Sequence, residues 1–274
     1  FRTLFAFGSK LLLSGLLHTI YMNLYSLVIG KKFSAVEVGY FNRASTLAQF
    51  PSINITNVLT RAIYPIQCQL QDQQDKLKNS FIQFIRLSVF LIFPLMIGVC
   101  VLSKPLVLLI LTEQWLPAAE LVQILCIAYM WYPVMSINNN MLNVRGRSDY
   151  FLKAEIIKKV IAIGILVATL PWGVKILCWG LVLYSFCDMA IIIYYTKKVL
   201  PAGFREQIKN ILPSLSLSVF TGGIAYGVIS LVQSPALQIL AGATTGILLY
   251  CTLAKLLHFR EMSIIHKIIK NRSL

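Results

Sequence analysis

The fold class is decided by residues 81–103, which read FIQFIRLSVFLIFPLMIGVCVLS. A helix that crosses about 30 Å of hydrocarbon needs roughly 20 predominantly apolar residues, and this stretch has that length and character. Similar runs fill the chain, since 57% of its 274 residues are hydrophobic and only 13% are charged, with a mean hydropathy of +0.74. A typical soluble domain is about a quarter charged. The sequence therefore predicts an all-α integral membrane protein.

Eight membrane-spanning helices are expected from run length and from the polar, glycine or proline residues between the runs. The expected spans cover approximately residues 5–29, 40–65, 81–103, 118–142, 152–171, 176–196, 211–232 and 236–257. They form one membrane domain, residues 1–257, in which the short apolar run after Lys104 is an interfacial extension. Because the chain opens with Phe1 rather than Met, we expect it to be a fragment truncated at its N-terminus.

Basic residues predict the orientation, because Lys and Arg near span ends are retained on the cytoplasmic side. One set of alternate connections, with the C-terminal end, is rich in them: Lys76, Lys78, Arg145, Arg147, Lys153, Lys197, Lys198, Arg205, Lys209, Lys255, Arg260, Lys267, Lys270 and Arg272. The other set has Lys31, Lys32, Lys104 and Lys175. Both ends are therefore predicted to be cytoplasmic. Residues 258–274, which alternate isoleucines with basic residues at helical spacing, are predicted to form a basic amphipathic tail on an anionic membrane surface.

The formal net charge of +15 is assigned to membrane topology rather than to nucleic-acid binding, because the basic residues lie between the apolar runs. The six cysteines are scattered without a C-x-x-C pair, which argues against a disulfide scaffold or a zinc site. The sequence also lacks G-x-S-x-G, H-E-x-x-H and the Walker-type G-x-x-x-x-G-K-[ST]. We therefore expect no enzyme activity, no cofactor, no metal and no nucleic-acid partner.

The first expected span carries a polar stripe. At about 100° per residue, Lys10, Ser14, His18, Tyr21 and Tyr25 fall within one sector of the helix surface. Ionisable groups inside a membrane are costly and typically face a water-filled cavity or a partner, so the stripe is a candidate cavity lining. His18 has a second interpretation, because a lone histidine is more often packed or hydrogen-bonded than a ligand or proton relay.

The second expected span carries another polar stripe, which is cationic. Its polar residues recur on one helix face: Arg43, Thr46, Asn54, Asn57 and Arg61. Pro51 removes a backbone hydrogen bond in the middle and should kink the helix, which is tolerated where neighbours or water compensate. Two interpretations stay open. Either the stripe lines a cavity, or Lys10, Arg43 and Arg61 snorkel to the interfaces while the two asparagines bond to a neighbouring helix.

Asp188 in the sixth expected span is the deepest acidic residue, with Tyr184 one turn before it and Tyr195 two turns beyond. It can pair with a lumen cation and act in ion coupling, or it can accept hydrogen bonds from neighbouring hydroxyls with no transport role. Four asparagines end the fourth span beside Arg145-Gly146-Arg147: Asn138, Asn139, Asn140 and Asn143. A helix-capping turn explains these asparagines at least as well as substrate contact does.

Six strings, in this order and at these intervals, resemble the polysaccharide-exporter branch of the multidrug/oligosaccharidyl-lipid/polysaccharide flippase superfamily, which includes the lipopolysaccharide, O-antigen and exopolysaccharide flippases. They are FGSK at 7–10, SLVIG at 26–30, GYFNRA at 39–44, FPLMIG at 93–98, AYMWYP at 128–133 and GRSD at 146–149. The resemblance covers most of residues 1–257 and is densest before residue 200. Each string alone is only modestly specific.

The resemblance implies two helical lobes around a central cavity, with Gly8-Ser9-Lys10 at the start of the second lobe and two extra helices at the C-terminus. This chain would then be a C-terminal portion. The implied activity is movement of an undecaprenyl-diphosphate-linked oligosaccharide across the bacterial cytoplasmic membrane by alternating access, in lipopolysaccharide, capsule or exopolysaccharide biosynthesis. The implied partners are that lipid-linked oligosaccharide, membrane lipids, and the polysaccharide polymerase and glycosyltransferases of the pathway.

The polar stripes suit such a substrate, because phosphate oxygens prefer Arg and Lys donors while sugars pair with planar amides and aromatic rings. The expected substrate-binding residues are Arg43, Arg61, Asn54, Asn57, Lys10, His18, Tyr21 and Tyr25.

Two other functions stay open, a membrane-embedded polysaccharide polymerase or ligase of the same pathway and a cation-coupled drug exporter of the same superfamily. Such an enzyme would present catalytic groups in a sizeable outer loop, whereas the expected outer connections are short and poor in acids and histidines. A cation-coupled exporter usually relies on intramembrane carboxylates, and Asp188 is nearly alone in the expected spans.

Overall fold

A computed structural model describes residues 8–9, 12–13, 15–16, 19–20 and 28–262. Every regular element in this part of the chain is helical, which confirms the predicted all-α class. Lys10, His18, Tyr21 and Tyr25 of the first expected span lie outside the described residues. The basic tail predicted beyond Met262 lies outside them as well.

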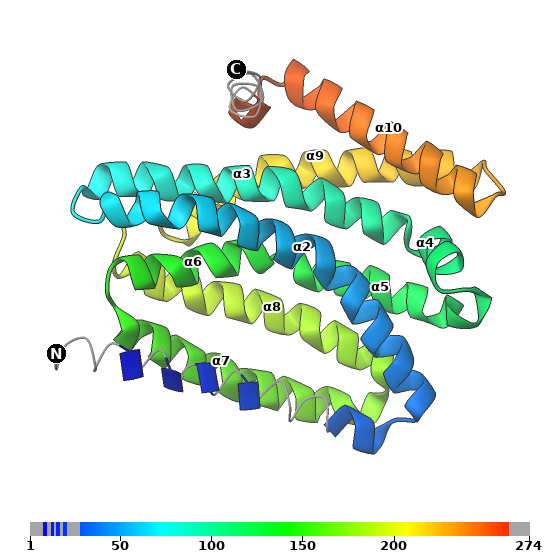
Figure 1. Cartoon of the computed structure of the whole chain (residues 1–274), viewed down its shortest axis with the longest axis horizontal. Coiled ribbons are helices and arrows are strands. Elements are labelled where there is room, and N and C mark those ends of the chain that lie inside the picture. The colour runs from blue at the N-terminus through cyan, green and yellow to red at the C-terminus, as the bar shows by residue number, and fades with distance from the viewer. Residues whose placement is uncertain (1–7, 10–11, 14, 17–18, 21–27, 263–274) are drawn as a thin grey trace.

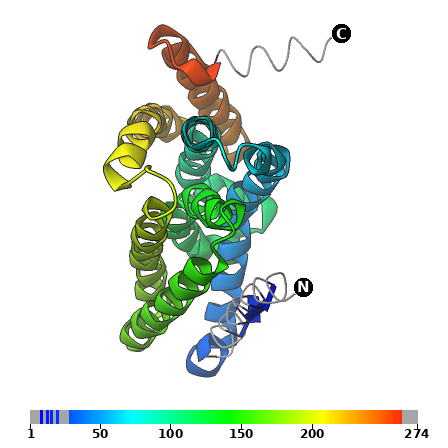
Figure 2. The ribbon, with the colours of Figure 1, turned by 90° about the vertical axis from the view of Figure 1, so that its left-hand side faces the viewer.

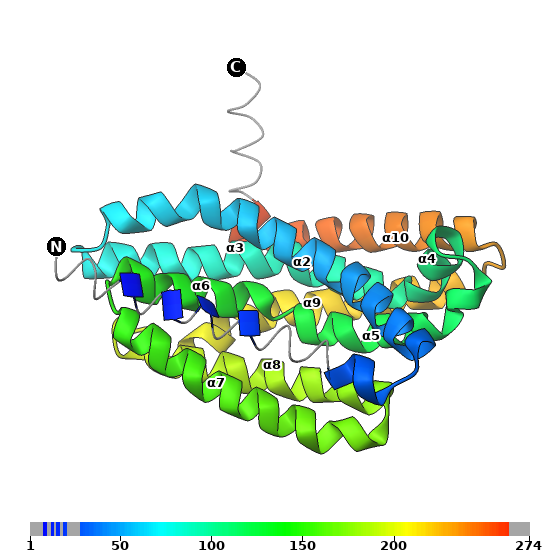
Figure 3. The same ribbon diagram turned by 60° about the horizontal axis from the view of Figure 1, so that its bottom comes forward.

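The helices run roughly along one common direction (Figure 1, Figure 3). Their bounds are α2 Ala35–Gln69, α3 Gln74–Val101, α4 Ser103–Ile110, α5 Leu116–Tyr129, α6 Tyr132–Val144, α7 Ser148–Thr169, α8 Val174–Lys197, α9 Phe204–Ser230 and α10 Pro235–Leu256, with 3-10 turns at Glu113–Trp115 and Leu170–Trp172. Each expected span from the second onward coincides mainly with one of these helices, except that the fourth covers most of both α5 and α6. The apolar run after Lys104 forms the short helix α4.

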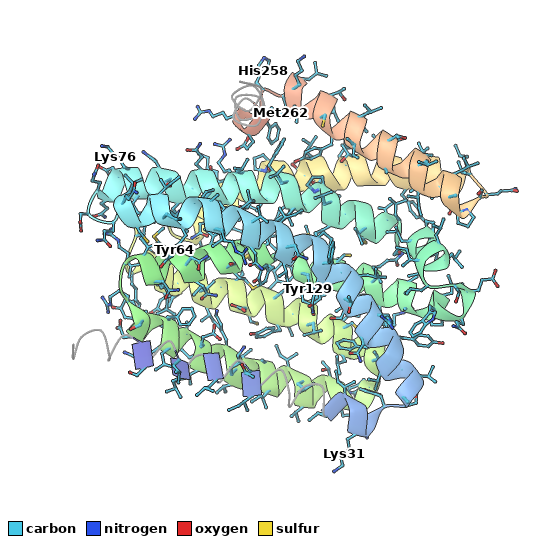
Figure 4. The ribbon with its side chains drawn as sticks, in the orientation of Figure 1. Lys31, Tyr64, Lys76, Tyr129, His258 and Met262 are labelled. Atoms are coloured by element: carbon cyan, nitrogen blue, oxygen red, sulfur yellow. The ribbon has the colours of Figure 1, made fainter. Side chains whose placement is uncertain are left out.

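The helix connections alternate between the two ends of the bundle. The α2–α3, α6–α7 and α8–α9 connections lie at one end, and the α7–α8 and α9–α10 connections lie at the other (Figure 1). Figure 4 shows the same separation through Lys76 and Lys31, which lie at opposite ends. The first of these ends holds Lys76, Arg145 and Lys197, each of which lies in or beside a connection. We call it the basic end.

Five described segments are long and apolar enough to cross a membrane: Gln74–Val101, Glu113–Val144, Val174–Lys197, Phe204–Ser230 and Pro235–Leu256. α2 and α7 have 35 and 22 residues, so their length does not exclude them. They differ in composition, because α2 is rich in polar residues and α7 carries the clustered charges Glu155, Lys158 and Lys159. The count of eight spans therefore stays a prediction, and the two polar long helices border the cavity described below.

Local sequence signals set the helix ends. Ser34 and Glu37 form a capping box at the start of α2: the Ser34 N–H donates to Glu37 Oε2 at 3.1 Å, and the Glu37 N–H donates to Ser34 Oγ at 3.2 Å. Gly146 terminates α6 with a φ of +66°, in the left-handed region that favours glycine. The next N–H, of Arg147, donates to the Leu142 carbonyl at 2.8 Å and satisfies a terminal helix acceptor.

The hydrophobic core is centred on α3, whose Phe81, Phe84 and Phe93 are among the largest fully buried side chains. An end-on view places α7 and α8 on one side of α3 and α10 on the other (Figure 2). α9 packs along α3 at Gly222, where a Cβ atom would lie only 2.3 Å from Ile97 Cγ2. Such small residues allow close helix approach in membranes, where burial from water supplies no driving force.

A proline in α3 explains how α10 is attached. Pro94 has no N–H to donate to the carbonyl of Phe90, one helical turn earlier. The Tyr250 hydroxyl of α10 donates to that carbonyl instead, at 2.9 Å. The helix interruption thus creates the acceptor for a bond between helices.

We predict that Tyr250→Phe lowers the free energy of unfolding by about 1 kcal/mol, because the Phe90 carbonyl loses its donor. The loss should shrink in a Pro94→Ala background, where the restored N–H of residue 94 can take the carbonyl. Denaturation of the four variants in detergent micelles measures the coupling. An equal loss in both backgrounds would contradict this role of the proline.

Candidate functional site

A cavity of about 600 Å³ lies between α2, α5, α6, α7 and α8 and also touches Gly15 of the first expected span. The polar residues of its lining carry hydroxyl, amide or charged groups: Gln49, Tyr129, Tyr132, Ser136, Asn139, Asn140, Asn143, Glu155, Lys158, Lys159, Tyr184, Ser185 and Asp188. A cavity that holds this many polar and charged groups within a membrane-protein bundle is the leading candidate for a binding site.

One wall of the cavity is a broken helix. The fourth expected span is interrupted at Met130 and Trp131, between α5 and α6. Pro133 accounts for the break, because it has no N–H to donate to the Tyr129 carbonyl. The Ser52 hydroxyl of α2 donates to that carbonyl at 2.8 Å, so a neighbouring helix supplies the missing donor.

The side chain of Tyr129 is also held by α2. Gln49 Nε2 donates to the Tyr129 hydroxyl at 2.7 Å, and Ser45 Oγ lies 3.3 Å from the same hydroxyl. Figure 4 places Tyr129 in the middle of the bundle beside α2. The contacts fix an aromatic ring and an amide side by side at the cavity wall.

Four ionisable side chains of α7 and α8 form a cluster on the opposite wall: Glu155, Lys158, Lys159 and Asp188, called the ion cluster below. Lys158 is at its centre, because its Nζ lies 2.8 Å from Asp188 Oδ1 and 3.0 Å from Glu155 Oε1. Lys159 Nζ lies 3.6 Å from Glu155 Oε2. The Asn139 amide oxygen of α6 accepts from Lys158 Nζ at 3.4 Å, so the cluster joins three helices.

The ion cluster is buried, since the Lys158 side chain is 1% exposed and that of Asp188 is 14% exposed. Lys158 lies ten residues into α7, which is about 15 Å along the helix at 1.5 Å per residue. Moving an ion into such surroundings carries a large desolvation penalty that only a close partner can offset. With all four groups ionised, two carboxylates balance two ammonium groups and the cluster has no net charge.

The asparagines at the end of α6 do not form a helix cap, because that role falls to Gly146. Asn139, Asn140 and Asn143 line the cavity instead. Asn138 exchanges two hydrogen bonds with Gln207 of α9, at 2.9 and 3.0 Å, and both side chains are fully buried. This amide pair attaches the start of α9 to the cavity wall.

The turn that follows α6 at the basic end is fixed by an ion pair outside the expected spans. Arg147 donates from Nε and Nη2 to the two carboxylate oxygens of Asp149, each at 2.8 Å. These hydrogen bonds lower the pKa of Asp149 to about 2. The Arg147 guanidinium also stacks 3.7 Å above the centre of the Tyr150 ring, which holds the start of α7 next to the cavity.

Comparison with known proteins identifies relatives of this chain. The family described as "Polysaccharide biosynthesis protein" matches residues 1–120. The teichuronic acid biosynthesis protein TuaB of Bacillus subtilis is 21% identical over 254 residues, which are 91% of this chain and 53% of that protein. The lipopolysaccharide biosynthesis protein WzxC of Escherichia coli is 25% identical over 223 residues, 80% of this chain and 45% of that protein. An uncharacterized membrane protein in the cps region of Klebsiella pneumoniae is 25% identical over 167 residues, 61% and 34% of the two chains.

The fold has a solved counterpart in the lipid II flippase MurJ in an inward closed conformation. The TM-score is 0.68 at 15% sequence identity, over 91% of this chain and 53% of that one. The chain is related to polysaccharide biosynthesis proteins, and its fold is similar to that of a lipid flippase. The resemblance read from the sequence is thereby confirmed. The chain spans about half the length, or less, of the relatives that it matches.

The predicted site residues of α2 do not line the cavity. Arg43, Asn54, Asn57 and Arg61 are exposed on one face of α2. The Arg43 guanidinium lies 5.8 Å from the centre of the Trp115 ring. At 100° per residue, the α2 positions that line the cavity adjoin this exposed face. The cationic stripe is therefore outside the cavity lining, to which α2 contributes Gln49 and Ile53.

Asp188 does line the cavity, and its partner is a cation, as one of the two interpretations expected. That cation is Lys158 of the adjacent helix. Sequence analysis missed Lys158, Lys159 and Glu155 as site residues. A signal was present, because three charges at i, i+3 and i+4 inside the expected span 152–171 point to one side of a helix. The interpretation of Asp188 as nearly alone was wrong for the same reason.

We predict that Lys158→Met destabilises the protein by about 3 kcal/mol or more, because it leaves buried carboxylates without their central partner. Lys158→Met combined with Asp188→Asn should cost less than the sum of the two single changes. Unfolding in detergent measures the cycle.

The matched control is Lys175→Met, which breaks the exposed pair with Glu120 and should cost less than about 1 kcal/mol. Additive effects of Lys158→Met and Asp188→Asn would contradict the coupling.

Proposed function

We propose that the chain forms part of a flippase that moves an undecaprenyl-diphosphate-linked oligosaccharide across the bacterial cytoplasmic membrane by alternating access. The named activities of the relatives support this proposal, since they act in lipopolysaccharide and teichuronic acid biosynthesis or flip lipid II. In the proposal the chain acts as a transporter and not as an enzyme, with both of its ends in the cytoplasm. Its partners are the lipid-linked oligosaccharide, surrounding lipids, and the polymerase and glycosyltransferases of the pathway.

The observation that carries the proposal is the set of amide, hydroxyl and aromatic groups that line the cavity. A glycan headgroup cannot cross hydrocarbon without groups that replace its water, and planar amides, hydroxyls and aromatic rings do so. Asn139, Asn140, Asn143, Tyr129 and Gln49 present such groups along the cavity.

The diphosphate requires cations, and the ion cluster is already neutral. We propose that Arg43 and Arg61 of the exposed α2 face bind the diphosphate, with Asn54 and Asn57 beside them. Guanidinium groups suit this task, because they donate two parallel hydrogen bonds to phosphate oxygens. In this proposal Lys10, His18, Tyr21 and Tyr25 complete the same path from the first expected span.

We predict that replacing Arg43 and Arg61 with Ala in the complete protein abolishes surface polysaccharide while the protein stays in the membrane. Replacing Lys31 and Lys32 with Ala removes the same charge from a connection and should leave export intact. Export is measured as surface polysaccharide, and protein level by immunoblotting of the membrane fraction. Unchanged export in the arginine variant would reject the assigned role.

A cation-coupled exporter is the second candidate, because the cavity contains two carboxylates, Glu155 and Asp188. Both carboxylates form ion pairs with lysines, whereas a carboxylate that binds a coupling ion needs to be free to do so. Drug efflux from vesicles, with and without an imposed proton or sodium gradient, separates the two functions. Gradient-dependent efflux of an uncharged drug would favour this candidate over the flippase.

A further inference from the structure

A second hollow, of about 940 Å³, lies at the basic end between the last turns of α8 and the first turns of α9. We call it the α8–α9 groove. α8 contributes Ala190, Ile193, Tyr194 and Lys197, and α9 and the residue before it contribute Gly203, Phe204, Arg205, Glu206 and Lys209. The two helices separate from this point, because α8 runs beside α7 while α9 runs beside α3 (Figure 1).

The groove has an excess of positive charge. Lys197, Arg205 and Lys209 are exposed, and none of them forms an ion pair with an acidic residue in the described part of the chain. The acidic residue of the lining, Glu206, is engaged by Lys78 of α3 at 2.8 Å. Three cations are therefore available to an anion at the mouth of the groove.

Below the cations the groove becomes apolar. On α8, Leu183, Ala190, Tyr194 and Lys197 fall within one sector of the helix at 100° per residue, so this face runs from apolar through aromatic to basic. Tyr194 is 59% exposed and Leu183 is 56% exposed. Exposed aromatic side chains at this position are typical of the boundary between headgroups and acyl chains.

α9 has the same order of side chains along its axis. Arg205 and Lys209 are one turn apart on one face, which continues into the exposed apolar residues Leu212 and Val219. Phe204 is 51% exposed at the start of the helix, and it lines the groove together with Tyr194 of the other wall. Both walls therefore present cations at the end of the bundle and hydrocarbon further in.

We propose that the α8–α9 groove binds an anionic phospholipid of the cytoplasmic leaflet. The phosphate lies among Lys197, Arg205 and Lys209, and the acyl chains follow the apolar faces of α8 and α9. A phospholipid has the same axial order of charge and hydrocarbon as the groove, and basic pockets between helices on this side of a membrane suit such headgroups. This site is separate from the polar cavity, and its occupancy does not require transport.

The test measures phosphatidylglycerol and phosphatidylcholine binding to the purified full-length protein by native mass spectrometry. Replacing Lys197, Arg205 and Lys209 with Gln should weaken phosphatidylglycerol binding about 100-fold, because each basic residue near an anionic lipid contributes about fivefold. Phosphatidylcholine binding should be weaker than phosphatidylglycerol binding in the wild type and unchanged by the substitutions. A Lys197→Arg, Lys209→Arg variant keeps the charge and should keep the binding.

The matched control replaces Lys76, Lys153 and Lys255 with Gln, which removes equal charge outside the groove and should leave binding at the wild-type level. Equal loss in both triple variants would overturn the proposal, because it would indicate attraction by overall charge. Displacement of the lipid by millimolar inorganic phosphate would also overturn the proposal. So would a protein that binds undecaprenyl diphosphate but does not bind phosphatidylglycerol.

Discussion

Hydrocarbon offers no hydrogen-bond partner, so each polar group inside this bundle needs one from the protein or from a water-filled space. Two prolines show how the constraint shapes the structure. Pro94 leaves the Phe90 carbonyl to Tyr250, and the break at Pro133 leaves the Tyr129 carbonyl to Ser52. Each interruption of one helix becomes an attachment for another. The first attaches α10 to α3, and the second places α2 against the broken wall of the cavity.

The same constraint governs the charges. Lysines and carboxylates in the middle of α7 and α8 are tolerated because they neutralise one another within the ion cluster. Arg43 and Arg61 differ from these charges, because both are exposed on the outer face of α2 and outside the cavity lining. The buried charges thus hold helices together, whereas the exposed ones are available to a ligand. This division explains why the cationic face of α2, and not the ion cluster, is proposed to bind a diphosphate.

The sequence was sufficient to predict the helices, because a run of about 20 apolar residues determines a span without knowledge of its neighbours. It was sufficient to single out Asp188, since a lone carboxylate in such a run is conspicuous. It did not reveal that Lys158 is the partner, because that pairing depends on which faces of α7 and α8 meet. Nor did it reveal the break after Tyr129, because Pro133 reads equally well as a kink within one span. The α2 stripe was predicted correctly as one face, but its relation to the cavity depends on helix packing.

The most direct test is whether water reaches the cavity in the membrane. Ser136 lines the cavity, whereas Leu248 is an exposed apolar residue in the middle of α10. In a full-length variant without native cysteines, each position is replaced in turn with Cys, and both inside-out and right-side-out membrane vesicles are treated with a membrane-impermeant thiol reagent. A water-filled cavity predicts rapid modification of Ser136→Cys and none of Leu248→Cys. If Ser136→Cys reacts no faster than Leu248→Cys, the polar residues are sealed packing groups and the cavity is not a path for a hydrophilic headgroup.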